Sequence, residues 1–223
     1  MNLHMLTQMF ALANQEDHRM TDTLETSTLA LAPEAQDLLF RAARTANTFT
    51  DEPVTEEQAR AIHDLVKWAP TAMNQQSLRV VLVRSPEARE RLVRHMTPGN
   101  RPKTRTAPLT AVLAADIDFH EHLPEVFPHK QGAKESLDGD EDARERVSRL
   151  NATLQVGYFI IGVRAAGLAA GPMTGFDAAA VDEEFFPDGR HRTLVVVNIG
   201  HPGPDAWFDR NPRLTFEQVV TTV

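Results

Sequence analysis

The chain has 223 residues, which is long enough for one sizeable core or two small ones. Its composition, 42% hydrophobic and 24% charged, is typical of a globular protein. Its formal net charge of -8 and the lack of a long basic run exclude binding to duplex nucleic acid through a basic face. The absence of cysteine excludes disulfides, thiolate metal sites, iron–sulfur ligation and cysteine nucleophiles.

The first 30 residues are predicted to be a loosely ordered extension, and residues 31–223 a single domain. The N-terminus has a short apolar centre without a basic region before it, which argues against a signal peptide. We expect Met20 to begin the ordinary protein, with residues 1–19 an upstream start or a loose arm. No stretch approaches the ~20 apolar residues of a membrane helix, so cytoplasmic residence is the default expectation.

Helical and strand patterns alternate along the rest of the chain. Thr55, followed three residues later by Gln58, forms a capping box that opens a helix ending near Ala69. The run at 109–116 has the apolar centre of a strand buried on both faces. The other predicted elements are helices at 32–45, 86–96, 143–166 and 177–185, strands at 78–85 and 192–203, an irregular stretch at 117–142, a tight loop at 171–176, and a tail that is extended and then weakly helical. This order predicts an α+β domain with helices packed on a small sheet.

Several familiar site patterns are absent. The histidines in HEH at 120–122, with His129 nearby, fit no zinc spacing. The acidic run at 138–142 begins like a calcium loop, but Ala143 and Arg149 occupy the positions of the required Gly and Glu. These acids are expected to cap the following helix. The sequence contains no G-x-S-x-G elbow, GxGxxG or Walker motif.

Polar residues instead gather at breaks between elements. They could supply cations for a phosphate, amides for the edge of a heterocycle, and a backbone amide beside a glycine for one ring atom. Each also has an ordinary explanation as a cap, a turn residue or a solvated charge. The set comprises Arg44, Thr45, Asn47, Thr71, Asn74, Gln76, Asn100, Lys103, Thr174, Gly175 and Arg213.

The order of these motifs resembles the nitroreductase superfamily of FMN-dependent oxidoreductases. The resemblance covers roughly residues 35–223 and is carried by KWAPTAMNQQSLR, GNRPKTRTAP, LPEVFPH, AAGLAAGPMTGFD, and VNIGHP followed by PRLTFE. Within the superfamily, the chain is most similar to the malonic semialdehyde reductase branch of the Rut pyrimidine-degradation pathway. The resemblance implies a nitroreductase-like fold with a small, mostly antiparallel sheet flanked by helices, in an intertwined homodimer.

The resemblance also implies roles for these residues in binding FMN. Arg44, Thr45 and Arg213 match residues that hold the FMN phosphate, and Asn47 stands where many relatives have a second basic residue. Pro70, Thr71, Asn74 and Gln76 match the loop that contacts the flavin from the other subunit. Asn100 and Lys103 match a pair at the pyrimidine end of the ring. Thr174 adjoins Gly175, whose backbone N–H points at flavin N5.

The reaction implied by the resemblance is ping-pong hydride transfer. NADH or NADPH reduces FMN at N5, and a second substrate then takes the hydride from the same place. Lys103 stabilises the negative charge of the reduced ring. Because no separate dinucleotide fold is needed, the missing GxGxxG does not argue against this function.

The resemblance favours malonic semialdehyde as the oxidant, reduced to 3-hydroxypropionate. Thr174 replaces the Glu of many bacterial nitroreductases and agrees with the small hydroxyl residue of the malonic semialdehyde reductase branch. A substrate carboxylate needs a cation, for which Arg79, Arg101 and Arg105 are candidates. The alternatives are a broad nitroarene or quinone reductase, a non-catalytic FMN-binding redox sensor, and a protein whose polar loops are only structural.

Overall fold

The computed structural model describes residues 29–223, so the expectations for residues 1–19 and Met20 lie outside the described residues. The chain divides into two units, with the boundary between Asp37 and Leu38. In the first unit, the described residues form α2 (Pro33–Gln36), and Gln36 donates a side-chain hydrogen bond to the carbonyl of Leu31. A π-helical turn, η1 (Asp37–Arg41), spans the boundary.

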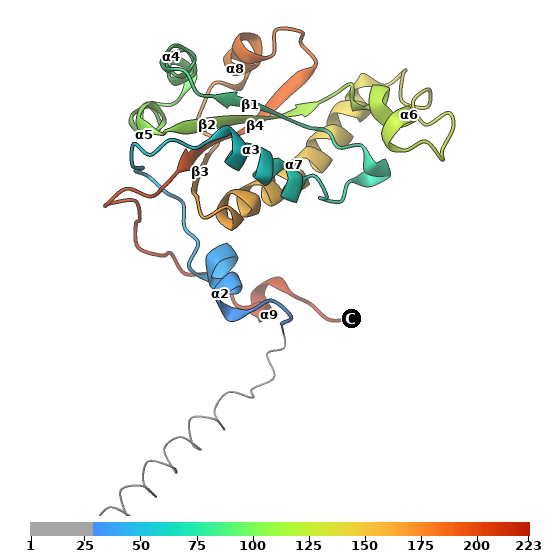
Figure 1. Cartoon of the computed structure of the whole chain (residues 1–223). Coiled ribbons are helices and arrows are strands. Elements are labelled where there is room, and N and C mark those ends of the chain that lie inside the picture. The colour runs from blue at the N-terminus through green and yellow to red at the C-terminus, as the bar shows by residue number, and fades with distance from the viewer. Residues whose placement is uncertain (1–28) are drawn as a thin grey trace, which may run out of the picture. The chain divides into compact units, whose positions relative to one another are not determined.

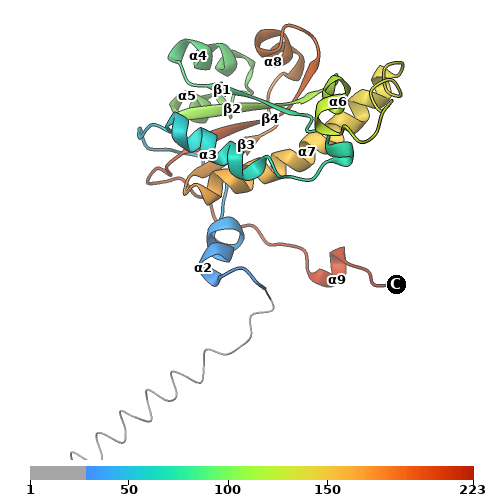
Figure 2. The ribbon, with the colours of Figure 1, turned by 45° about the vertical axis from the view of Figure 1, so that its right-hand side comes forward.

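The second unit is built around a four-stranded antiparallel sheet with strand order β1-β2-β4-β3. All three strand pairs are antiparallel, which confirms the predicted fold class. Figures 1 and 2 show α4 and α8 on one face of the sheet and α3 and α7 on the other. The strands are β1 (Leu78–Val83), β2 (Leu109–Asp116), β3 (Ala169–Met173) and β4 (His191–Gly200). The helices are α3 (Glu56–Val66), α4 (Pro86–His95), α5 (Arg101–Thr106), α6 (Leu123–Val126), α7 (Glu141–Ala165), α8 (Ala178–Phe185) and α9 (Phe216–Val219), with 3₁₀ turns η2 (Ala72–Asn74) and η3 (Phe119–His122).

The core lies on both faces of the sheet, because successive strand side chains point to opposite sides. Every residue of β2 is buried, as predicted from its apolar run. Leu109, Ala111 and Leu113 pack in the cluster that includes residues of α3 and α7. Val112 and Ala114 pack in the cluster that includes residues of α4 and α8. A central strand with two buried faces therefore holds both helical layers together.

Two sequence predictions are wrong at particular residues. The first helix was expected to run to Thr45, but the helical structure ends at Arg41. The chain must be extended there, because Thr45 pairs with Ala170 of β3 and the Ala46 N–H donates to the Ala170 carbonyl at 3.0 Å. The loop expected at 171–176 begins as strand, since Gly171 to Met173 pair with β4. Pro172 is tolerated there because β3 is an edge strand of the sheet.

The predicted helix caps are confirmed. The Thr55 hydroxyl accepts from Gln58 N at 3.1 Å, and the Gln58 side chain accepts from Thr55 N at 2.8 Å. Asp140 Oδ1 accepts from Ala143 N at 2.9 Å, so the acidic run does cap α7.

Within residues 29–223, no helix is long and apolar enough to cross a membrane. In the same residues, no group of three or more Asp, Glu, His or Cys side chains is placed to hold a metal ion.

Candidate active site

The loop after α3 has a strained backbone. Met73, Asn74 and Gln76 have positive φ angles of 53°, 49° and 44°. Such angles are uncommon for residues other than glycine and cost on the order of 1–3 kcal/mol each. This cost persists only where the surrounding structure enforces it, and such segments concentrate at binding and catalytic sites.

Two buried amides of α7 enforce the loop conformation. Asn151 Oδ1 accepts a hydrogen bond from Ala72 N at 2.8 Å, and Gln155 Oε1 accepts from Leu78 N at 3.0 Å. These bonds hold the loop at both ends against the long helix. Neither residue was singled out from the sequence, because a polar residue on a long helix gives no sign of a backbone partner more than 70 residues away.

The three amide side chains of the loop have different environments. Asn74 Nδ2 donates to the carbonyl of Val126 at 2.9 Å. Gln75 is buried, where it donates to the Ala72 carbonyl and accepts from Ser77. Gln76 lines a cavity of about 700 Å³ beside β1, and its side chain has no hydrogen-bond partner within residues 29–223. Gln76 therefore has donor and acceptor groups free for a ligand, while the other two amides shape the loop.

Pro70 and Thr71, the other two residues of this loop expected to contact the flavin, lie at its start. Pro70 is exposed and follows the buried Ala69, which lies three residues beyond the end of α3 at Val66. The hydroxyl of Thr71 accepts from Gln76 N at 3.2 Å, which closes the loop from within. Thr71 thus has a structural partner, and its carbonyl also accepts from Asn74 N at 3.1 Å.

A second turn, at Thr174–Phe176, follows β3. The Gly175 carbonyl accepts from Thr97 and from Asn100 Nδ2, the latter at 2.9 Å. The backbone N–H of Gly175 has no hydrogen-bond partner within the described part of the chain. Asn100, which was expected at the pyrimidine end of a flavin, thus has its amide nitrogen on Gly175. It also precedes α5, whose Lys103 is half-buried and makes no ion pair within residues 29–223.

Arginines gather where the C-terminal segment passes the end of η1. Arg210 Nη2 donates to the Arg41 and Ala43 carbonyls at 2.6 and 3.1 Å. Arg44 Nη1 donates to the Phe208 carbonyl at 3.2 Å. Arg164, from the last turn of α7, donates to the Leu39 carbonyl, and its buried Nε has no partner. Burial and then the positive charge of Arg210 lower the pKa of the Arg164 guanidinium.

These three cations make no ion pair with any carboxylate in residues 29–223, which favours an anionic ligand. The family resemblance implied Arg213, and not Arg210 or Arg164, as the phosphate ligand near the C-terminus. Arg213 is exposed and donates to the carbonyls of Asn211 and Pro212 in its own segment. Asn47 Nδ2 lies 3.4 Å from the Thr45 carbonyl and 3.5 Å from that of Ala206, so it secures the two segments to each other.

Strand β3 connects the arginines to the Gly175 turn. It pairs with Thr45 through Ala170 and leads directly into Thr174 and Gly175. Five residues of extended chain span roughly 16 Å. The cations and the free N–H of Gly175 are therefore arranged for an extended ligand with an anion at one end and a hydrogen-bond acceptor at the other.

The arginines considered for a substrate carboxylate have partners in the structure. Arg79 forms an ion pair with the buried Asp116 at 2.8 Å, and its Nη1 donates to the Gln76 carbonyl. Arg105 pairs with Glu90 at 2.7 Å, and Arg101 donates to the Met96 carbonyl at 2.9 Å. Of the three, Arg79 is the one that lines the large cavity.

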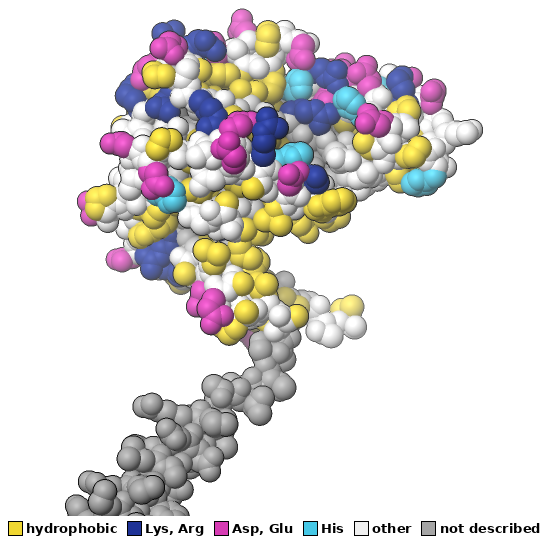
Figure 3. All heavy atoms as spheres, viewed as in Figure 1, with side chains coloured by type: hydrophobic (Ala, Val, Ile, Leu, Met, Phe, Trp, Pro, Cys, Tyr) yellow, Lys and Arg dark blue, Asp and Glu magenta, His cyan; other side chains and the backbone are white. Residues whose placement is uncertain are grey.

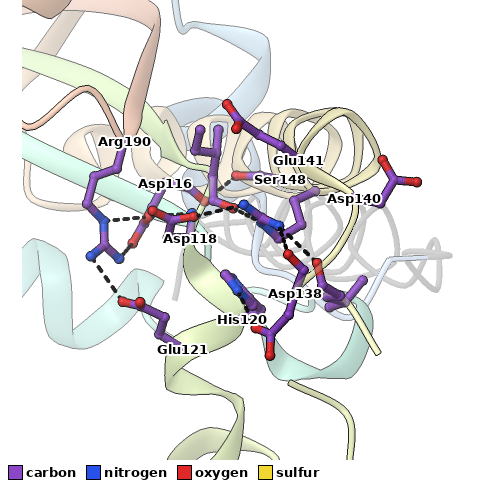
Figure 4. Close-up of polar contacts among 12 residues, drawn as sticks. Asp116, Asp118, His120, Glu121, Asp138, Asp140, Glu141, Ser148 and Arg190 are labelled. Atoms are coloured by element: carbon purple, nitrogen blue, oxygen red, sulfur yellow. Dashed lines mark hydrogen bonds and ion pairs between the residues drawn. The ribbon is translucent and has the colours of Figure 1, made fainter. Parts of the chain in front are cut away.

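Asp116 is the centre of a polar network at the end of β2 (Figure 4). Arg190 binds its carboxylate through Nε and Nη2 at 3.1 and 3.0 Å, and the Ser148 hydroxyl donates to its carbonyl at 2.7 Å. Hydrogen bonding to Asp116 raises the pKa of Arg190. His120, from the HEH motif, lies buried beside Asp138, with Nε2 and Oδ1 3.1 Å apart. The network secures the irregular 117–140 segment to the sheet and to α7.

Comparisons with known proteins agree on one family. The Nitroreductase family matches residues 40–201. A Streptomyces coelicolor protein assigned as an NADH dehydrogenase/NAD(P)H nitroreductase is 66% identical over 195 residues, covering 87% of this chain and 99% of that protein. Two solved structures share the fold. One, from Bacillus subtilis and assigned as a nitroreductase, has a TM-score of 0.75 at 21% identity and covers 85% of this chain and 99% of its own. The other, from Exiguobacterium sibiricum and assigned as a nitroreductase in complex with FMN, has a TM-score of 0.74 at 15% identity and covers 88% and 100%.

Proposed function

This chain belongs to the nitroreductase family and is an oxidoreductase, and we propose that it reduces a small carbonyl substrate with NADH or NADPH through FMN. The family uses FMN with NAD(P)H, which confirms the cofactors expected from the sequence. The observation that carries the proposal concerns the two ends of β3. Within residues 29–223, three arginines without a carboxylate partner lie at one end, and the Gly175 N–H without a hydrogen-bond partner lies at the other.

The residues present fit FMN. A phosphate matches Arg44, Arg164 and Arg210, which make no ion pair with a carboxylate in the described residues, and the buried Nε of Arg164 is a donor in need of an acceptor. The Gly175 N–H suits an acceptor atom such as flavin N5. A side chain at 175 would require Asn100 and Thr97 to move, because its Cβ would lie 2.6 Å from Asn100 Nδ2 and 2.7 Å from Thr97 Oγ1.

Bound FMN would supply the hydride-transfer chemistry between NAD(P)H and the oxidant. The chain contributes orientation and charge. Arg44, Arg164 and Arg210 hold the phosphate, the Gly175 N–H fixes the ring edge, and Lys103 places a positive charge near the pyrimidine edge. Thr174 is exposed next to Gly175 and provides a small hydroxyl beside the reacting face. Thr45 and Arg213, which the family resemblance implies as phosphate ligands, stay proposals. Their contacts within the described chain neither support this role nor prevent it.

Matched arginine variants test the phosphate site. Arg164→Gln and Arg210→Gln are expected to weaken FMN binding at least tenfold, because hydrogen bonds to charged groups contribute about 1.5–3 kcal/mol each. Binding of riboflavin, which lacks the phosphate, should change little. Arg94→Gln, at an exposed arginine of α4, is the control, and Arg213→Gln tests the ligand that the family resemblance implies. Titration by flavin fluorescence measures both ligands, and equal losses for FMN and riboflavin would show that the arginines do not hold the phosphate.

The charge of Lys103 gives a second test of the flavin site. Lys103→Ala is expected to weaken FMN binding or slow its reduction by NAD(P)H, because a cation near the pyrimidine edge stabilises the reduced ring. Anaerobic stopped-flow absorbance measures the rate. A variant with wild-type flavin content, potential and reduction rate would show that Lys103 has another role.

We propose malonic semialdehyde as the oxidant, on the basis of the GPMTGF motif and the small Thr174. A second candidate, reduction of nitroarenes or quinones, is favoured by the assigned activity of the relatives. The visible spectrum of the protein distinguishes them. After anaerobic bleaching with NAD(P)H, rapid return of the yellow colour with malonic semialdehyde supports the first, and recovery only with nitroarenes or quinones supports the second. Tight FMN binding without NAD(P)H oxidation would indicate a redox sensor.

We further propose that the protein is a homodimer in which the C-terminal segment reaches the partner subunit. Three exposed apolar side chains follow each other at helical spacing on α7: Leu150, Leu154 and Tyr158. Trp68, after α3, is 79% exposed. Figure 3 shows hydrophobic side chains gathered in the region of α7. Exposed apolar surface of this kind is typical of a protein interface.

The C-terminal segment has matching features. Phe216 and Val219 are exposed, and Val220 is extended after α9. The cavity beside β1 is lined by both apolar and charged side chains, and β1 is an edge strand whose outer side has no partner strand in residues 29–223. Light scattering after gel filtration tests the proposal: Leu154→Glu should give monomers, while Glu145→Gln on the same helix should not. A wild-type protein that elutes as a monomer would refute the dimer.

A further inference from the structure

The carbonyl of Gly175 receives an unusual number of hydrogen bonds. Thr97 donates to it twice, from its backbone N–H and from Oγ1, both at 3.0 Å. Asn100 Nδ2 adds a third at 2.9 Å. A carbonyl oxygen has two lone pairs, so three donors saturate it and fix the plane of the peptide between Gly175 and Phe176.

This fixed peptide is linked to the one before it. The N–H of Phe176 donates to the carbonyl of Thr174 at 3.2 Å, which closes a three-residue turn centred on Gly175. The Thr174 carbonyl belongs to the same peptide as the Gly175 N–H. The donors on Gly175 therefore constrain two successive peptides, and the Gly175 N–H remains without a partner in the described residues.

The chain on both sides of the turn is held as well. Met96 pairs with Phe176 in an antiparallel bridge, and Asp177 N donates to the His95 carbonyl at 2.9 Å. The segment from His95 to Thr97 thus lies alongside Gly175, Phe176 and Asp177. Hydrogen bonds in a chain polarise one another, so donors on the Gly175 carbonyl strengthen the Phe176 bond and, through the Thr174 carbonyl, the Gly175 N–H as a donor.

We propose that Thr97 and Asn100 are positioning residues that aim and polarise the Gly175 N–H toward flavin N5, and thereby set the redox potential of the flavin. This inference rests on the proposed function. It gives Asn100 a role different from direct contact with the pyrimidine edge, and it gives a role to Thr97, which the sequence did not single out.

The direction of the effect follows from the chemistry of N5. In oxidised flavin N5 is only an acceptor, whereas in reduced flavin it carries a hydrogen of its own. A fixed N–H donor therefore favours the oxidised form. Removing the Thr97 hydroxyl should weaken binding of oxidised FMN more than binding of reduced FMN, which raises the midpoint potential.

The test compares Thr97→Val, Asn100→Leu and the double variant with two controls, since leucine removes the Asn100 donor without adding a charge beside the flavin. Thr97→Ser keeps the hydroxyl and should restore wild-type behaviour. Thr106→Val makes the same chemical change on α5, where the hydroxyl donates to the Pro102 carbonyl instead. For Thr97→Val, the dissociation constant of oxidised FMN should rise about fivefold, the effect of one neutral hydrogen bond. With binding of reduced FMN unchanged, that corresponds to a potential about 20 mV higher for a two-electron couple.

Flavin fluorescence gives the dissociation constant, and equilibration with a reference dye gives the potential. A larger rise in both quantities for the double variant, with wild-type values for both controls, supports the proposal. Wild-type potentials in Thr97→Val and the double variant overturn it, even if FMN affinity falls, because equal loss for both redox forms is only a structural effect. Failure of the wild-type protein to bind FMN would instead refute the proposed function.

Discussion

Replacing Gly162 with alanine is expected to destabilise the protein, because α3 and α7 pack too closely there for a β-carbon. A Cβ at position 162 would lie 2.2 Å from Val66 Cγ1, while the Ile62 Cγ2 contact at 3.4 Å is ordinary. The two colliding carbons must separate by about 1 Å, and such overpacking costs about 1–3 kcal/mol. In the opposite direction, alanine stabilises a helix interior by about 1 kcal/mol relative to glycine. The net expectation is a loss of about 1 kcal/mol in the free energy of unfolding.

The substitution Val66→Ala removes the colliding carbon and supplies the control. In that background Gly162→Ala should stabilise the protein by about 1 kcal/mol, because the helix propensity remains and the collision is gone. The sign of the Gly162→Ala effect therefore reverses, and the double-mutant cycle should give a coupling of about 2 kcal/mol. Urea unfolding at one fixed protein concentration measures all four proteins, since the stability of an oligomer depends on concentration. Equal effects of Gly162→Ala in both backgrounds would refute the reasoning.

Three further outcomes are expected. Asp116→Asn should lower the free energy of unfolding by about 2–3 kcal/mol, somewhat below the cost of breaking a fully buried ion pair, because Arg79 and Arg190 are partly exposed; a loss too small to resolve in urea unfolding would contradict this. Asn151→Leu should weaken FMN binding about tenfold, because Ala72 N loses its acceptor and the strained loop can relax. Asn151→Asp keeps that acceptor and is the control. Calorimetric titration compares the FMN affinities of the two variants, and equal affinities would count against the role of Asn151. Finally, FMN at 100 times its dissociation constant should stabilise the protein by about 2.7 kcal/mol, and an unchanged melting temperature after flavin removal would exclude binding to the folded state.

The sequence alone determined those elements whose signals are local. The capping box of Thr55 and Gln58 uses residues three apart, so it predicts a helix start without any tertiary information. The apolar run at 109–116 predicts a strand buried on both faces, because any polar side chain there would lose its hydration. The family motifs likewise predicted the fold class and the cofactors.

Tertiary structure decided the elements and contacts that depend on distant partners. Gly171 and Pro172 have the local preferences of a turn, yet pairing with β4 makes them an edge strand. Asn151 can be recognised as the hydrogen-bond acceptor for Ala72 N, in the loop after α3, only once α7 is placed against that loop. Arg164 and Arg210 are 46 residues apart in sequence, and their shared position follows from the path of the C-terminal segment. A side-chain contact across such a separation leaves no periodic pattern in one sequence, so only the folded chain shows which charges converge.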